Sequence, residues 1–376
     1  MGLTHVPTIR LADLTEAQKR AYLLADNKLV EQAGWDRELL ALEFQELQAL
    51  ELDCDLTITG FSTAEIDLLM DSLSADDDDP DGDDPNPGDE PPPTTPPVSR
   101  RGDLWLLGPH RVLCGDATDP AAFLLLMEGQ LAQMVFLDPP YNVPIGGHVC
   151  GLGAVQHPNF AMASGEMSEA DFTTFLQSLF TQLTQQSVEG AIHYLCMDWR
   201  HLYELLTAAR SVYPTIKNLC VWTKDNGGMG TFYRSQHELV LVAKHGTAPH
   251  INNFELGQHG RYRTNVWSYP GSNSFHADRE QLLALHPTVK PVAMIADAIK
   301  DCSHRGGIIL DSCAGSGSTM LGAEQTGRCA YLMKLDPRYV DTAVRRWERA
   351  TGQTAHHAET GLTFTQMQED RGHERA

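Results

Sequence analysis

The sequence predicts an α/β protein with a mostly parallel sheet covered by helices on both faces, preceded by a small helical segment. Short, nearly continuous apolar runs recur after residue 100, among them AQMVFL (132–137) and GIIL (307–310). Helical patterns lie between several of them, such as EADFTTFLQSLFTQLTQQ (169–186). Apolar strands that alternate with helices are typical of a parallel sheet buried on both sides.

The chain begins with a helical pattern. Apolar residues recur at helical spacing between residues 14 and 50 and again in TAEIDLLMDSL (63–73). Thr15 followed by Gln18 has the form of a capping box, which marks a helix start. We therefore expect a small helical domain over residues 1–75.

A linker is expected after this domain. Residues 76–99 contain only Asp, Glu, Pro, Gly, Asn, Ser, Thr and one valine, a composition that cannot bury enough apolar surface to fold. The polar residues 351–376 predict a flexible tail. The body of the protein should then span residues 100–350.

The formal net charge of −22 is unevenly distributed. Residues 1–75 hold 14 acids and 5 bases, and residues 76–90 hold 9 acids and no base, so the body is close to neutral. The charge therefore neither supports nor excludes a nucleic-acid partner. No apolar run is long enough for a membrane span, the eight cysteines form no CxxC pair, and no secretory signal is evident, so we expect a cytoplasmic protein.

The first chemical motif is Asp138-Pro139-Pro140-Tyr141, directly after the apolar run 132–137. Ligands bind at the carboxyl ends of strands in such sheets. Asp138 and the Pro139 carbonyl could accept hydrogen bonds from the exocyclic amine of a base taken out of a duplex, and Tyr141 could stack on its ring. The alternative is a proline-stiffened loop with a capping aspartate.

The second motif is DSCAGSGST (311–319), between a strand and a helix. Its glycines would let the backbone approach a ligand at a helix N-terminus, although a tight turn without a ligand has the same pattern. No Gly-Lys-Ser/Thr follows, so it is not a Walker loop.

Together these segments resemble the β-class of amino-group DNA methyltransferases, which act on adenine N6 or cytosine N4. HPTVKP (286–291), LDPRY (335–339) and GDA (115–117) resemble further motifs of that class, in the expected order over about residues 100–350. The resemblance implies a Rossmann-like S-adenosylmethionine-dependent methyltransferase fold with a seven-stranded, mostly parallel sheet and a permuted motif order. Residues 1–60 resemble the end of a ParB/sulfiredoxin-like domain, as in prophage-type methylases.

The resemblance also implies site residues. The catalytic residues would be Asp138, Pro139, Pro140 and Tyr141. The cofactor S-adenosylmethionine would be bound by Asp116, Asp138, His286, Thr288, Lys290, Pro291, Asp311, Cys313, Ala314, Gly315, Ser316, Gly317, Lys334 and Asp336. The segment 142–285 would read the DNA, with contacts from Asn142, Arg234, Arg261 and Arg263.

The sequence departs from the family at the cofactor site. Ser312 and Cys313 replace a Pro-Phe pair, and Lys334 stands where the family has an acid that accepts hydrogen bonds from the ribose hydroxyls. Lysine has no acceptor, although Asp336 is close enough in sequence to substitute. We therefore expect weakened or absent cofactor binding.

The resulting expectation is a site-specific DNA methyltransferase that acts on double-stranded DNA, with adenine N6 favoured by aspartate at the first motif position. The alternatives are a catalytically weakened or inactive DNA-binding relic and an enzyme acting on RNA or protein amides. The class implies a possible homodimer. His148 and His157 are expected to be loop residues, and no metal is expected. His237 and Glu238 would either contact substrate or form a structural pair.

Overall fold

The computed structural model describes residues 14–28, 36–50, 55–75, 96–143, 165–225, 227, 232–257, 261–271 and 290–373. Two compact units are distinguished: residues 1–82 with 256–261, and residues 83–255 with 262–376. Most of the predicted linker, residues 76–95, lies outside the described residues.

The first unit contains the helices expected from the sequence: α1 (Glu16–Lys28), α2 (Arg37–Ala49), the 3-10 helix η1 (Leu56–Thr59) and α3 (Thr63–Ala75). The capping box is present, since the Thr15 amide donates to Gln18 Oε1 and the Gln18 amide donates to Thr15 Oγ1. Phe44 and Phe61 pack edge-to-face at 5.3 Å in the small core between the helices.

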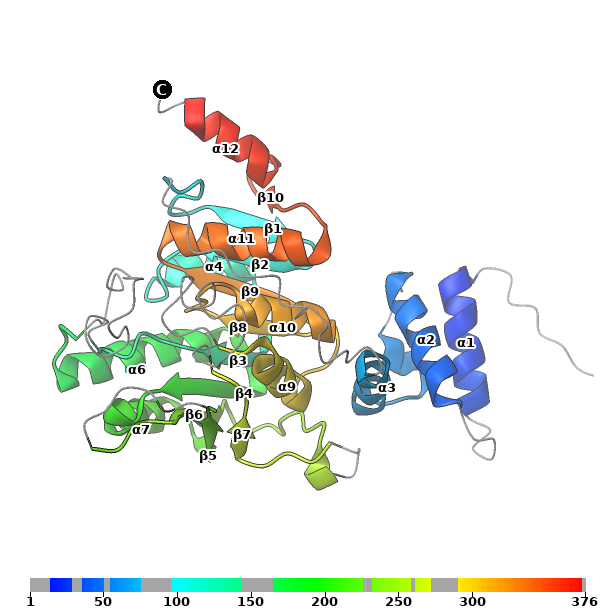
Figure 1. Ribbon diagram of the computed structural model, residues 1–376, viewed down its shortest axis with the longest axis horizontal. Coiled ribbons are helices and arrows are strands. Elements are labelled where there is room, and N and C mark those ends of the chain that lie inside the picture. The colour runs from blue at the N-terminus through cyan, green and yellow to red at the C-terminus, as the bar shows by residue number, and fades with distance from the viewer. Residues whose placement is uncertain are drawn as a thin grey trace, which may run out of the picture. The chain divides into compact units, whose positions relative to one another are not determined.

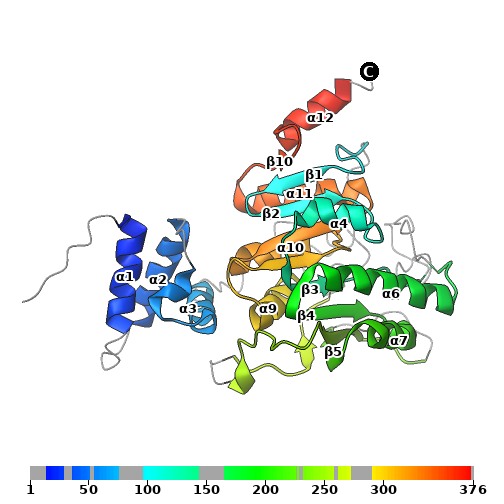
Figure 2. The ribbon, with the colours of Figure 1, turned by 180° about the vertical axis from the view of Figure 1, so that it is seen from behind.

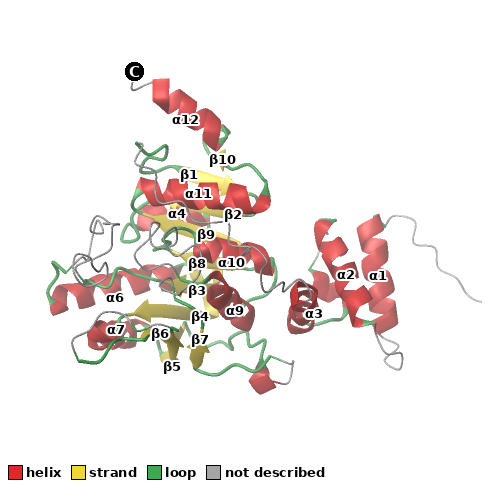
Figure 3. Ribbon diagram, in the orientation of Figure 1, coloured by secondary structure: helices red, strands yellow, loops and turns green. Residues whose placement is uncertain are grey.

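The second unit is built on one sheet with helices on both faces (Figures 1 and 3). Ten strands are described. In their order across the sheet they are β10 (His356–His357), β1 (Leu104–Leu107), β2 (His110–Cys114), β9 (Cys329–Lys334), β8 (Ile308–Asp311), β3 (Ala132–Leu137), β4 (Ser187–Met197), β6 (His237–Lys244), β5 (Thr215–Thr223) and β7 (Val266–Ser268).

The five strands from β2 to β4 are mutually parallel, and β6 runs antiparallel to both of its neighbours. The expected Rossmann-like, mostly parallel methyltransferase sheet is thus confirmed, but it is wider than seven strands. Strands β1 and β10 extend one edge, and β7 extends the other.

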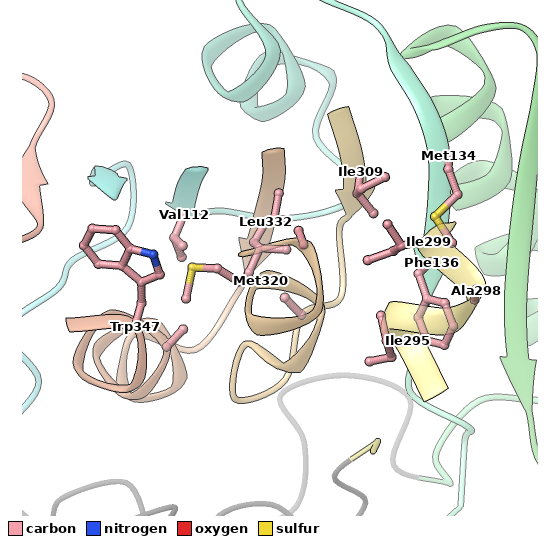
Figure 4. Close-up of a cluster of buried hydrophobic side chains, with 14 of the residues drawn as sticks. Val112, Met134, Phe136, Ile295, Ala298, Ile299, Ile309, Met320, Leu332 and Trp347 are labelled. Atoms are coloured by element: carbon pink, nitrogen blue, oxygen red, sulfur yellow. The ribbon is translucent and has the colours of Figure 1, made fainter. Parts of the chain in front are cut away.

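Alternating strand residues divide the core into two clusters, because successive side chains of a strand point to opposite faces. One face packs against α9 (Val292–Cys302), α10 (Ser318–Thr326) and α11 (Pro337–Thr351), where Met320 lies between Trp347 and the strand residues Val112 and Leu332 (Figure 4). The other packs against α4 (Pro120–Met127), α6 (Glu169–Gln185) and α7 (Leu202–Val212) (Figure 2).

The prediction of a flexible tail over residues 351–376 is wrong for the described part of that segment. Residues 356–357 pair with β1, and α12 (Phe364–His373) follows. Phe364 is buried against Trp105, with ring centroids 5.1 Å apart. Arg371 forms an ion pair with Asp103. The apolar anchors are too widely spaced along a polar stretch to have shown a pattern in the sequence.

This packing predicts that Phe364→Ala destabilises the second unit by about 3 kcal/mol, because a buried aromatic ring leaves a cavity when truncated. Urea unfolding followed by tryptophan fluorescence measures the change. Gln368→Ala, at an exposed position of α12, is the matched control. Equal stability of both variants and the parent protein would show that the tail does not contribute to the core.

Candidate active site

The carboxyl ends of β3 and β8 lie side by side, since Val135 pairs with Leu310 in parallel register. The next described helix after β3, α6, covers one face of the sheet, and the helix after β8, α10, covers the other. Open α/β sheets bind their ligands at such a switch point. The pairing brings the loops that begin at Asp138 and Asp311 together, although these residues are 173 positions apart in the sequence.

Asp138 lies at the centre of a hydrogen-bonded network at the carboxyl end of β3. The Tyr141 hydroxyl donates to Asp138 Oδ1 at 2.6 Å, and Lys290 Nζ donates to Asp138 Oδ2 at 2.8 Å. Lys290 Nζ also lies 3.1 Å from the Tyr141 hydroxyl oxygen. Both carboxylate oxygens are therefore fixed, and the Asp-Pro-Pro-Tyr loop is joined to Lys290, two residues before α9.

Glu238, on β6, completes the network. Its Oε2 lies 2.9 Å from Lys290 Nζ, and its Oε1 accepts from Lys224 Nζ. The prediction paired Glu238 with His237 or with substrate, and it did not include Lys224. The available signal was a single acid in the apolar run HELVLVAK (237–244), because a charge in a buried strand requires a partner.

The buried charges strongly shift one another's pKa values. Burial alone would lower the pKa of Lys290, but the carboxylates of Asp138 and Glu238 raise it well above its usual range. Burial alone would raise the pKa of Glu238, but the two lysines hold it well below its usual range. Burial and the adjacent carboxylates raise the pKa of Tyr141. The network therefore holds a charged lysine, a charged glutamate and a neutral tyrosine.

The glycine-rich loop is held from two sides. Asp311 accepts from the Cys313 amide at 3.0 Å and from Thr319 Oγ1 at 2.7 Å, and burial raises its pKa to about 7. Buried Arg346, on α11, donates to the Ser316 carbonyl oxygen and to Ser316 Oγ, each at 2.9 Å. Gly317 has φ +91°, and a Cβ there would meet Ala343 Cβ at 3.0 Å, so the turn requires glycine.

Ser312 and Cys313 are the two residues of this loop that differ from the family pattern, and their side chains have different environments. Ser312 is buried, and its Oγ is a buried polar atom without a hydrogen-bond partner. Burial raises the pKa of the Cys313 thiol to about 12, so it is neutral near pH 7. The unsatisfied hydroxyl fits a polar ligand at the carboxyl end of β8, because an unpaired buried hydroxyl is otherwise costly.

Three further predicted residues, Lys334, Asp336 and Asp116, lie at or just after the carboxyl ends of the neighbouring strands β9 and β2. Lys334 Nζ lies 5.1 Å from the centre of the Tyr339 ring. Asp336 caps α11 and is bound by Arg338, with Oδ1 accepting from its amide and Oδ2 from its guanidinium at 2.6 Å. Asp116 Oδ1 accepts from the amide and the hydroxyl of Thr118. The Asp336 carboxylate thus already binds Arg338, so a ribose hydroxyl would have to share it with that arginine.

Three of the four residues predicted to contact DNA are buried or bind other parts of the chain. Asn142 is buried and binds the backbone of Gly165 and Met167. Arg261 is buried, and Arg263 pairs with Asp297 and Asp301. Arg234 is exposed. Polarity alone could not distinguish structural from surface arginines in the sequence.

Some predictions fall outside the described residues: His286 and Thr288 of the HPTVKP segment, and His148 and His157. Pro291 is described and precedes α9. Within the described ranges, no cluster of three His, Cys, Asp or Glu side chains could hold a metal. No helix in the same ranges is both long and apolar enough to cross a membrane.

Residues 132–345, more than half of the chain, match the N6/N4-type DNA methylase family. The chain belongs to this family. Its methyl donor is S-adenosylmethionine, so this methylase is an S-adenosylmethionine-dependent DNA methyltransferase, as the resemblance implied. Residues 38–101 match the ParB-methyltransferase HTH domain, which spans α2, η1 and α3 and confirms the ParB-like resemblance.

Two of the curated relatives share less than a quarter of their residues with this methylase over the aligned part. Type II methyltransferase M2.MboI of Moraxella bovis is 21% identical over 61% of this chain and 85% of its own. DNA adenine methyltransferase YhdJ of Escherichia coli is 23% identical over 63% of this chain and 83% of its own. Type II methyltransferase M.ScaI of Streptomyces caespitosus is 38% identical, over 24% of this chain and 29% of its own.

Solved structures similar to the methylase include the M1.HpyAVI–SAM complex, with a TM-score of 0.46 and 17% identity over 62% of this chain and 97% of that one. The cytosine-N4-specific PvuII DNA methyltransferase gives a TM-score of 0.47 and 11% identity over 73% of this chain and 94% of that one.

The buried network predicts that Glu238→Gln destabilises the methylase by about 3 kcal/mol, because removal of one partner leaves buried charge uncompensated. The loss should be constant above about pH 5 and shrink as the pH falls below 4.5, the ordinary pKa of glutamate, toward the lowered pKa of Glu238 in the folded protein. Urea unfolding between about pH 3 and pH 7 measures it. Glu359→Gln, at an exposed position, should be neutral, and a similar small loss in both variants would contradict the assigned network.

Proposed function

We propose that this chain methylates adenine N6 within a specific sequence of double-stranded DNA, with residues 100–350 as the catalytic domain, residues 142–285 contributing DNA recognition, and residues 1–75 as an accessory helical domain. One observation carries the proposal: Asp138 is fixed at the carboxyl end of β3 between the Tyr141 hydroxyl and the Lys290 ammonium. A fixed carboxylate at this position is suited to orient an amine.

The roles of the residues follow from their donor and acceptor chemistry. Each oxygen of the Asp138 carboxylate has a second lone pair, so Asp138 can accept an amine N–H while it keeps its bonds to Tyr141 and Lys290. The Pro139 carbonyl can accept the other N–H of the amine. Lys290, fixed by Glu238, keeps the carboxylate from rotating. Positioning of this kind lowers the barrier mainly by removing orientational freedom.

The cofactor would be held along the ends of β8, β9 and β2. The glycine-rich loop 314–317 and Ser312 Oγ would contact it near β8, and Asp116 and Lys334 would lie near its nucleoside. Bound S-adenosylmethionine supplies an activated methyl group. When the amine nitrogen gains that methyl group it must lose a proton, which the Asp138 carboxylate can accept and pass to solvent.

Adenine rather than cytosine is proposed because aspartate occupies the first position of the catalytic motif. The relative YhdJ is named a DNA adenine methyltransferase, which is consistent with this choice. An RNA or protein amide substrate has no supporting observation.

The test is incorporation of tritiated methyl groups from S-adenosylmethionine into a DNA library, with sequencing that separates N6-methyladenine from N4-methylcytosine. We expect N6-methyladenine at one sequence and at least a hundredfold loss of rate in Asp138→Ala, because that variant lacks the orienting acceptor. Asp370→Asn, on the exposed side of α12, is the control. Methylcytosine as the product would overturn the base assignment, and unchanged activity of Asp138→Ala would overturn the mechanism.

A second candidate function is a weakened or inactive methylase that binds DNA. It is favoured by one observation: Lys334, at the end of β9, is a donor only, and the nearby Asp336 carboxylate would have to share its acceptors between Arg338 and the ribose hydroxyls. Charge-assisted hydrogen bonds to such hydroxyls contribute about 1.5–3 kcal/mol each.

We therefore expect Lys334→Glu to bind S-adenosylmethionine at least tenfold more tightly than the parent chain, as measured by isothermal titration. Lys217→Glu, an exposed strand lysine replaced in the same way, controls for the change in net charge. Micromolar binding by the parent chain without any gain in Lys334→Glu would show that the lysine itself serves the ribose, and the second candidate would then be rejected.

A further inference from the structure

Exposed aromatic side chains gather beside the carboxyl end of β4. Trp199 is 50% exposed and lies in the 3-10 helix η2 (Trp199–His201) after β4, and Tyr203 is 75% exposed and lies in the first turn of α7. Phe232 is 88% exposed and Tyr233 is 83% exposed, and both precede β6. Folded proteins rarely leave such large rings in water as a group, unless the group serves as a binding surface.

The two segments form one surface. Trp199 Nε1 donates to Ser235 Oγ at 3.0 Å, and β4 pairs with β6 through Met197 and Leu239. The rings of Phe232 and Tyr233 have centroids 4.4 Å apart. Two arginines flank these rings: Arg200 lies 5.1 Å from the Trp199 ring centre, and Arg234 follows Tyr233. We call these six residues, Trp199, Arg200, Tyr203, Phe232, Tyr233 and Arg234, the aromatic surface.

The aromatic surface lies close to the proposed catalytic loop. Arg234 is four residues before Glu238, whose Oε2 lies 3.1 Å from the Tyr141 hydroxyl. Four extended residues span at most about 14 Å, a length that covers about four nucleotides of one DNA strand. The surface can therefore reach nucleotides next to a base held at Asp138.

The chemistry of the surface favours bases over phosphates. Arg200 is paired with Asp198 at 3.0 Å, so much of its charge is already compensated. The rings offer flat apolar faces, and such faces stack on bases. An intact duplex hides the faces of its bases, whereas bases beside a flipped nucleotide or in a single strand expose theirs.

We propose that the aromatic surface binds unpaired bases of the DNA strand next to the target adenine. The proposal rests on the proposed function for its substrate, DNA. It adds that the protein holds locally opened DNA by stacking, and that single-stranded DNA is itself a ligand of this chain.

The test is fluorescence anisotropy of the full chain with a labelled single-stranded oligonucleotide and with the corresponding duplex, in the absence of S-adenosylmethionine. We expect the double variant Phe232→Leu/Tyr233→Leu to bind the single strand at least tenfold more weakly. Phe232→Tyr should bind it like the parent chain, because only the flat ring is required. Leu124→Ala, at an exposed position of α4 outside the segment proposed for DNA recognition, is the control.

Three results would overturn the proposal: no binding of the single strand by the parent chain, equal binding by the leucine variant, or loss of self-association in that variant with unchanged DNA binding. The last result would assign the surface to a second copy of the chain. None of these readouts requires methyl transfer, so failure of the proposed function appears separately, in the methylation assay on duplex DNA.

Discussion

The buried ammonium group of Lys290 is the constraint on which the active-site region depends. A buried charge is tolerated only with partners of opposite charge, and Lys290 takes them from β6 and from the loop after β3. The strands β3 and β6 are not neighbours in the sheet, because β4 lies between them. One side chain thus joins two strands and the segment before α9, and it fixes the Asp138 carboxylate as a consequence.

The glycine-rich loop is also held by buried polar side chains, Asp311 and Arg346. The carbonyl oxygen of buried Ser316 needs a donor. Arg346 supplies that donor from α11, and Asp311 binds the other end of the loop. Buried side chains from distant segments therefore hold both loops.

Local features of the fold could be predicted from the sequence, and pairings across the fold could not. The apolar run before Asp138 and the glycines after Asp311 have local patterns, and both loops lie where expected. The ion pair between Glu238 and Lys290 joins residues 52 positions apart, and no local pattern encodes such a pair.

Asn142 and Arg263 show the same limit. The sequence does not indicate whether a polar residue binds the backbone, a carboxylate or DNA. Anchoring of the tail by Phe364 was missed for a related reason, since a single buried ring has no periodicity.

The contact between Arg371 and the start of the second unit has a topological consequence. Arg371 donates to the Val98 carbonyl oxygen and to the Asp103 carboxylate, so the first and last described parts of the unit are adjacent. A domain whose ends are adjacent can be joined there and opened elsewhere without disturbing its sheet. The order of the Asp138 and Asp311 loops along such a domain then depends only on where the chain is opened. The same pairing of β3 with β8 would arise from either order.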